Sequence, residues 1–114
     1  MAASRDDDLR PDITRALLLL AEDPDAETRG AAVSTLAEFQ DLAPAVADGL
    51  AGLLDDDYLL VRLAAAYGLA RRDDPRTAEA IERLGRLPAG YEHDHRLSTL
   101  WRWSWQKENP GGAW

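Results

Sequence analysis

Two segments of the chain share one pattern at an offset of 33 residues. Each has an acidic turn, then an arginine, then a run of small residues rich in alanine, and they span residues 23–32 and 56–65. The positions that match best keep this spacing throughout: Asp23 with Asp56, Arg29 with Arg62, and Ala32 with Ala65. A fainter third copy is marked by Arg96, 34 residues after Arg62. A period of this length indicates stacked supersecondary units, because one unit cannot bury its apolar face alone.

The residues between these marks have helical periodicity. Apolar side chains recur every three or four positions, and prolines with acidic residues separate one stripe from the next. No stretch alternates between polar and apolar residues as a strand would. The sequence therefore predicts an all-α solenoid of three helical hairpins, about six helices in total. The predicted boundaries are a disordered tail at 1–7, repeats at about 8–41, 42–72 and 74–106, and a flexible tail at 107–114.

The predicted fourth helix, from about Tyr58 to Arg71, is apolar nearly all round. A helix of this kind is buried on more than one side. We therefore expect it in the middle of the stack, with a hairpin on each side. The acidic triplet 55–57 precedes it as a turn, and Asp57 is the residue expected to cap its first amides.

An acidic turn, then Thr-Arg or Val-Arg, then an Ala-rich helix resembles the HEAT repeat. The similarity is closest to the short bacterial subtype, also called the PBS-lyase HEAT-like repeat, and covers residues 12–85 well. It implies an α-solenoid that presents an extended surface to proteins, and less often to nucleic acid or a ligand. It also implies a structural ladder between repeats, formed by the turn acids and the second-helix arginines: Asp23 with Arg29, Asp56 with Arg62, and Arg96 in the third copy. Gly90 stands where the third turn acid is expected, which suggests that the last repeat is a cap.

Charge and composition narrow the classes of partner. The chain has 21 Asp and Glu against 13 Lys and Arg, a net charge of −8. This charge disfavours nucleic acid and anionic membrane surfaces. It either only keeps the chain dispersed or also steers it toward a basic protein. There is no cysteine, and the longest apolar run, 16–21, is far too short to span a membrane. The expected compartment is the cytoplasm, and the excess of arginine over lysine is typical of a GC-rich bacterial genome.

Residues 92–95, Glu-His-Asp-His, form the one cluster with metal-capable side chains. Two histidines at positions i and i+2 point apart on a helix, and a closed site needs three or four ligands. We therefore interpret the cluster as a polar loop before the last helix. Ser98, His95 and Asp94 include the residue types of a hydrolytic triad, but no nucleophile elbow accompanies them. The sequence predicts no enzyme activity, no cofactor and no metal.

The aromatic residues of the last predicted helix are the candidate contact site. Three of the four tryptophans fall in the run Trp101, Arg102, Trp103, Ser104, Trp105. On a helix, Trp103 and Trp105 lie away from the centre of the apolar face and are expected to be partly exposed. Tryptophan and arginine are favoured at the centres of protein interfaces. The alternative is that these rings only shield the end of the stack from water.

The leading functional hypothesis is a non-enzymatic scaffold that binds another protein as an adaptor, a regulator or an immunity-type blocker. Two alternatives stay open at the level of sequence. One is an accessory protein that handles a ligand, like the bilin lyases whose repeats this chain resembles. The other is a structural repeat fragment that forms a homo-oligomer through its C-terminal helix.

Overall fold

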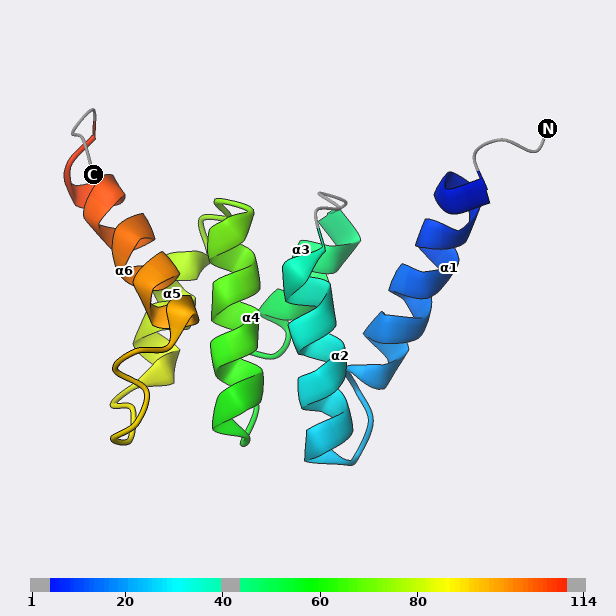
Figure 1. Ribbon diagram of the computed structural model, residues 1–114, viewed down its shortest axis with the longest axis horizontal. Helices are drawn as coiled ribbons and strands as arrows, with labels where there is room; N and C mark the ends of the chain where they lie inside the picture. The colour runs from blue at the N-terminus through cyan, green and yellow to red at the C-terminus, as the bar shows by residue number, and fades with distance from the viewer. Residues whose placement is uncertain (1–4, 40–43, 111–114) are drawn as a thin grey trace.

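The computed structural model describes residues 5–39 and 44–110 (Figure 1). This part of the chain contains helices and turns and no strand. The helices are α1 (Arg5–Leu20), α2 (Ala26–Glu38), α3 (Pro44–Ala51), α4 (Leu59–Arg71), α5 (Thr77–Leu84) and α6 (His95–Glu108). The prediction of an all-α fold with six helices is therefore confirmed.

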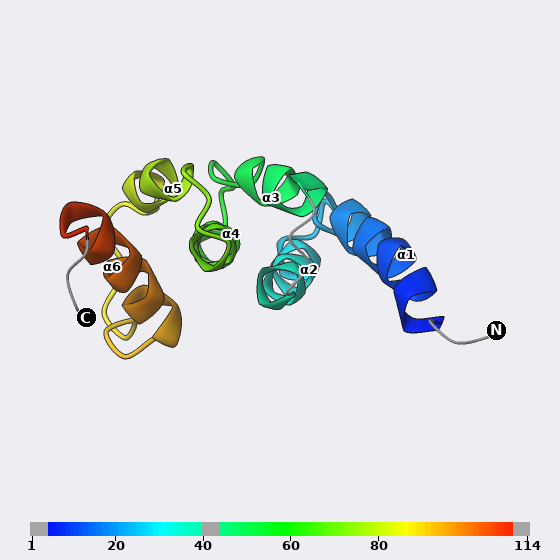
Figure 2. The same cartoon turned by 90° about the horizontal axis from the view of Figure 1, so that it is seen from above.

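The helices form two layers that curve into an arc. Figure 2 shows α1, α3 and α5 on the outer side of the arc and α2, α4 and α6 on the inner side. Along the inner layer, α4 packs against both α2 and α6. The stack measures 47 × 37 × 22 Å, with α1 and α6 at opposite ends of its long axis (Figure 1). This arrangement is an α-solenoid.

Two helix ends lie beyond the boundaries expected from the sequence. Helix α1 begins at Arg5, inside the stretch 1–7 that was expected as a disordered tail. Helix α6 continues to Glu108, where the Asn109 amide bonds the Trp105 carbonyl and Pro110 follows. The rest of the two expected tails, residues 1–4 and 111–114, lies outside the described residues.

Helix α4 is the centre of the core, as its apolar sequence predicts. Val61 and every residue from Leu63 to Ala70 are buried. The helices approach closely at Gly68, where an added Cβ would lie 2.7 Å from Leu50 Cδ1 and 3.0 Å from Ala37 Cα. Glycine is therefore required at this position for α2, α3 and α4 to approach one another.

Four aspartates each close a turn by accepting an amide two residues later. The same geometry precedes α2, α4 and α6 and recurs just before α5. The accepting and donating residues are Asp23 and Asp25, Asp56 and Tyr58, Asp74 and Arg76, and Asp94 and Arg96. The expectation that Asp57 caps α4 is wrong. Asp56 occupies the turn instead, and the N-cap residue Tyr58 makes no side-chain cap bond.

Candidate protein-binding surface

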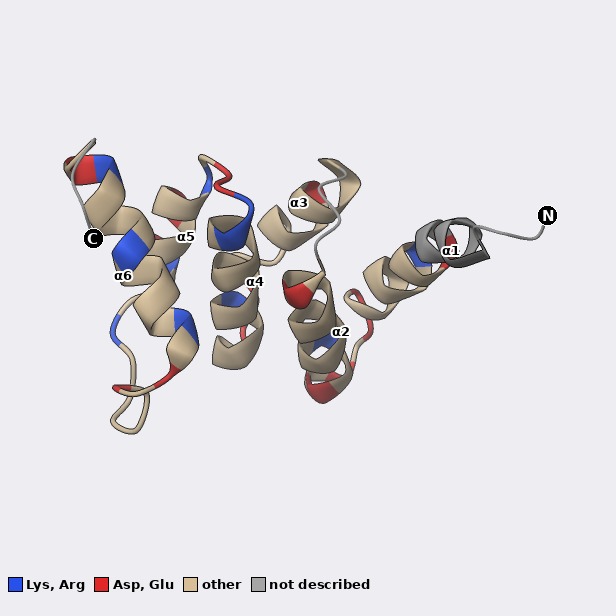
Figure 3. Ribbon diagram, turned by 45° about the horizontal axis from the view of Figure 1, so that its top comes forward, with Lys and Arg blue, Asp and Glu red and all other residues tan. Residues whose placement is uncertain are grey.

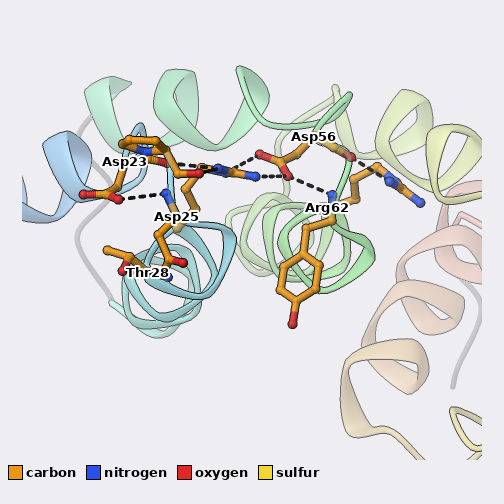
Figure 4. A network of polar contacts seen from close by, with 8 residues as sticks. Asp23, Asp25, Thr28, Asp56 and Arg62 are labelled. Atoms are coloured by element: carbon orange, nitrogen blue, oxygen red, sulfur yellow. Dashed lines mark hydrogen bonds and ion pairs between the residues drawn. The ribbon is translucent and has the colours of Figure 1, made fainter.

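Arg29 joins the first hairpin to the second by binding Asp23 and Asp56, which are both labelled in Figure 4. Its Nε donates to Asp56 Oδ2 at 2.8 Å and its Nη2 to Asp56 Oδ1 at 3.1 Å, so the two side chains form a bidentate pair. Its Nη1 donates to the carbonyls of Asp23 at 2.9 Å and Pro24 at 3.0 Å. One guanidinium thereby ties its own turn to the turn of the next repeat.

The charge state of Asp56 depends on this pair. Its side chain is only 8% exposed, and burial on its own raises the pKa of a carboxyl. The hydrogen bonds from Arg29 and from the Tyr58 amide outweigh burial, and the pKa of Asp56 is lowered below its usual value. The carboxylate is therefore ionised when the stack is folded at neutral pH.

The next arginine in the series, Arg62, makes no such pair with a carboxylate of the described residues. Its Nη1 donates to the backbone carbonyl of Asp56 at 2.6 Å. Its buried Nε has no acceptor among the described residues. The carboxylate of Asp56, expected to pair with Arg62, lies against Arg29 instead, because the ladder runs from one repeat's arginine to the following repeat's acid. The corresponding turn acid before α6 is Asp94, which pairs with Arg96 of its own turn, so the expectation that Gly90 stands at this position is wrong.

Arg96 bonds within its own turn. Its Nε donates to Asp94 Oδ1 at 2.9 Å and its Nη2 to Asp94 Oδ2 at 2.7 Å. These bonds lower the pKa of Asp94 to about 2. Arg96 therefore fixes the start of α6 and does not extend the ladder to another repeat.

A second set of ion pairs, not anticipated from the sequence, links the outer layer. Arg76 Nη1 lies 3.1 Å from Asp48 Oδ1, and Arg83 pairs with Asp55. Both pairs join residues 28 positions apart, and this shared spacing is the signal that could have revealed them. They connect the second hairpin to the third and are largely exposed, so each contributes little stability by itself.

Trp103 fastens α6 to the turn between α4 and α5. Its Nε1 donates to Asp73 Oδ1 at 2.8 Å. Lys107 Nζ lies 3.0 Å from the same carboxylate and 5.4 Å from the centre of the Trp103 ring. Lys107 and then Trp103 are the groups that hold the pKa of Asp73 below its usual value. One of the tryptophans predicted to contact a partner is thus engaged with its own chain.

The other predicted contact residues differ in exposure. Trp101 is 60% exposed, and the neighbouring Arg102 is also exposed. Trp105 is half-buried, like Trp103. Trp101 and Arg102 are therefore more exposed than Trp103 and Trp105.

The comparisons with known proteins agree with this architecture. A family model described as HEAT repeats matches residues 13–91, more than half of the chain. The chain belongs to the HEAT repeat family. Members of this family commonly mediate protein–protein interaction and are typically not enzymes. No curated protein and no solved structure matches the chain. The match identifies the family, and the short bacterial subtype stays a prediction.

The last HEAT hairpin also encloses a groove between its two helices. This groove has a volume of about 330 Å³ and an apolar lining that includes Ile81, Leu84, Leu87, Tyr91, Leu97 and Trp101. Trp101, on α6, forms part of its rim. An open apolar groove at the end of a HEAT stack is a second candidate surface beside the inner layer.

The cluster at residues 92–95 has local structural roles in the HEAT stack. Glu92 accepts the Gly90 amide at 2.9 Å, and Asp94 caps α6. The ring of His95 meets the edge of Tyr67 with 5.3 Å between ring centres. Within the described residues there is no group of three side chains arranged to hold a metal ion. None of the helices described is both long and apolar enough to cross a membrane.

Proposed function

We propose that this chain is a non-enzymatic binding module that attaches to another protein through its inner helical layer and the exposed end of α6. The observation that carries the proposal is Trp101, which is 60% exposed beside the exposed Arg102. A large aromatic ring next to a guanidinium is the composition of an interface hot spot. Adaptor, regulatory and immunity-type roles all need a rigid surface of this kind.

Rigidity of that surface supports the proposal. The inner layer is held by the Arg29–Asp56 pair, and α6 is held by the bond from Trp103 to Asp73. Side chains presented on a scaffold fixed in this way lose less conformational freedom on binding, which improves affinity. Trp103 therefore supports the contact surface indirectly, by positioning the helix that carries Trp101.

The charge distribution favours a basic partner. Glu27 and Glu38 are exposed on α2, and Figure 3 shows acidic residues at both ends of this inner helix. The net charge of −8 raises the association rate with a positively charged surface and lowers it with an acidic one. Raising the ionic strength is expected to slow binding to such a partner.

The test is affinity capture from a lysate of the native host, followed by mass spectrometry. Wild type is compared with the double variant Trp101→Ala/Arg102→Ala. The matched control is Glu82→Ala/Arg86→Ala, which removes two exposed charged side chains from the outer layer. Circular dichroism melts establish that all three proteins are folded.

A specific protein that wild type and the control retain, and that the Trp101→Ala/Arg102→Ala variant loses, supports the proposal. A specific protein retained by both variants moves the contact away from α6. Trp103→Ala distinguishes a role in holding α6 on the stack from a role in contacting the partner protein, because it removes the bond to Asp73 and leaves Trp101 in place. Capture of nucleic acid or of a coloured small molecule, with no protein, overturns the proposal.

A further inference from the structure

The last hairpin differs from the other two in how its helices pack. Helix α1 packs against α2, and α3 packs against α4. Helices α5 and α6 both pack against α4 but scarcely against each other, and Figure 2 shows them diverging at the end of the arc. Helix α6 is therefore held mainly by the preceding hairpin and hardly by the helix that comes before it in the chain.

The contacts that hold α6 are made with α4 and with the turn that follows α4. Leu97 and Leu100 are buried in the common core. Toward the other end of the helix, Trp103 Nε1 and Lys107 Nζ both bind the carboxylate of Asp73, at 2.8 Å and 3.0 Å. An α6 helix from a second copy of the chain can make all of these contacts, because they do not depend on which α5 it is connected to.

The connection between α5 and α6, residues 85–94, has two positions at which its course can change. Gly85 directly follows α5 with a φ of 68°, and Gly90 has a φ of 106°. An added Cβ at either position would lie in open space, with no atom within 4 Å beyond its chain neighbours. Glycine reaches other backbone conformations at little cost. Ten residues span up to about 33 Å when extended, so the connection is long enough to carry α6 to a neighbouring molecule.

We propose that α6 is an exchangeable arm, and that two copies of the chain form a dimer in which each α6 packs against α4 of the other copy. Such a domain swap repeats the contacts of the monomer, and only the connection 85–94 takes a new course. The partner is a second copy because the surface of α4 is already complementary to α6. The dimer is favoured by high protein concentration and by a shorter connection. This exchange goes beyond the proposed function, since it concerns contacts of the chain with itself.

Two charge variants of the full chain report which α4 each α6 contacts. Asp73→Lys and Lys107→Asp each place two like charges at the contact between these positions, in the monomer and in any dimer of identical chains. In an equimolar mixture, only a dimer with exchanged α6 helices pairs a lysine with an aspartate at both contacts. Random pairing gives as much mixed dimer as the two other dimers combined. The expected result, measured by native mass spectrometry, is a mixed dimer in excess of that amount.

The matched control carries both substitutions, Asp73→Lys and Lys107→Asp, in one chain. It has lost the same bond from Trp103 to Asp73 but restores the charge pair within the molecule. It is expected to give no more dimer than wild type. Wild type itself is expected to be a monomer in dilute solution and to gain dimer on incubation at high concentration. A mixture of the single variants without excess mixed dimer overturns the proposal, as does wild type that forms no dimer at any concentration.

The length of the connection distinguishes exchange from contact between two intact molecules. Deletion of residues 86–90 keeps Gly85 and the Asp94 cap of α6, and is expected to give a dimer with the helical dichroism of wild type. Insertion of ten glycine and serine residues after Gly90 in both charge variants is expected to reduce the mixed dimer, because each α6 then returns more easily to its own α4. A folded monomer from the deletion overturns the proposal. A mixed dimer that is unaffected by the insertion also overturns it, and this second measurement does not require the deletion variant to fold.

Discussion

Arg29 and Arg62 occupy equivalent positions in two repeats but make different sets of bonds. Arg29 neutralises a carboxylate that is 8% exposed and also binds two carbonyls. Arg62 binds one carbonyl and leaves its buried Nε without an acceptor. The ladder of the stack therefore has a strong first rung and an incomplete second one.

Replacement of each arginine by methionine measures this difference. Arg29→Met is expected to destabilise the fold strongly, because Asp56 would remain buried as an unpaired charge. Arg62→Met removes one hydrogen bond together with an unsatisfied donor, so its cost is expected to be no more than about 1 kcal/mol. Urea denaturation at neutral pH gives both free energies of unfolding. Equal losses would contradict the assignment of Arg29 as the main tie between repeats.

Asp94 gives the fold a defined sensitivity to acid. Its folded pKa is about 2, because Arg96 holds the ionised form, whereas an unfolded aspartate has a pKa of about 4. A lowered folded pKa stabilises the protein above the unfolded pKa, and this contribution is lost as the pH falls from about 4 to about 2. Asp94→Asn lacks it at every pH. Its melting temperature is expected to lie below that of wild type at pH 7, with the gap closing over that window. A constant gap would show that the Arg96 pair does not cause the effect.

The sequence named Arg29 and Asp56 among the ladder residues but did not pair them with each other. Arg29 lies six residues after Asp23 and 27 before Asp56, and spacing alone favours the nearer acid. The structure reverses this choice because the turn of the second hairpin stacks directly beside Arg29. The incomplete rung at Arg62 was not predicted, because the sequence comparison put Gly90 at the third turn, where the structure has Asp94 paired with Arg96.

At the scale of the helices, substitutions at two glycines distinguish the effect of close helix packing from the effect of helix propensity. Gly68 lies where α4 meets α2, and a Cβ there would approach Ala37 and Leu50 within 3.0 Å. Gly30, on α2, would place its Cβ at ordinary contact distances of 3.8 Å from Tyr58 and 3.9 Å from Val61.

Alanine is expected to act in opposite directions at these two sites. Gly68→Ala should destabilise by about 1–3 kcal/mol through overpacking. Gly30→Ala should stabilise by about 0.5–1 kcal/mol through helix propensity. Thermal melts of the two variants measure both changes in stability. The gain in helix propensity from glycine to alanine applies at both sites, so the difference between the variants reports the cost of overpacking at Gly68. Stabilisation by both would mean that α2 and α4 can separate without cost.

Helix types and approximate positions followed from periodicity, whereas the contacts of the last helix did not. The angular position of Trp103 predicts partial exposure, and the ring is indeed half-buried. Its bond to Asp73, 30 residues earlier, depends on how α6 leans on the preceding turn, which no local pattern encodes. The gap between α5 and α6 was missed for the same reason, because the 33-residue period implies hairpins of equal packing.

For the whole molecule, stability is expected to decrease from the centre of the stack toward the first helix. Helix α4 packs against α2, α3, α5 and α6, whereas α1 packs mainly against α2 and to a smaller extent against α3. Backbone amides exchange with solvent when their helix opens locally, and helices with fewer neighbours open at lower free energy. Hydrogen exchange measured by mass spectrometry should show the slowest exchange in α4 and faster exchange in α1. Uniform protection across the helices would instead indicate a single cooperative unit.

The concentration of tryptophan in α6 gives the chain a built-in optical probe of one end. Three of the four tryptophans lie in α6, so most of the intrinsic tryptophan fluorescence reports on the last hairpin, while circular dichroism averages over every helix. A fluorescence melt that precedes the dichroism melt would mean that this hairpin detaches first. Coincident curves would mean that the hairpins melt together. The order in which the stack comes apart can therefore be read without attaching any label.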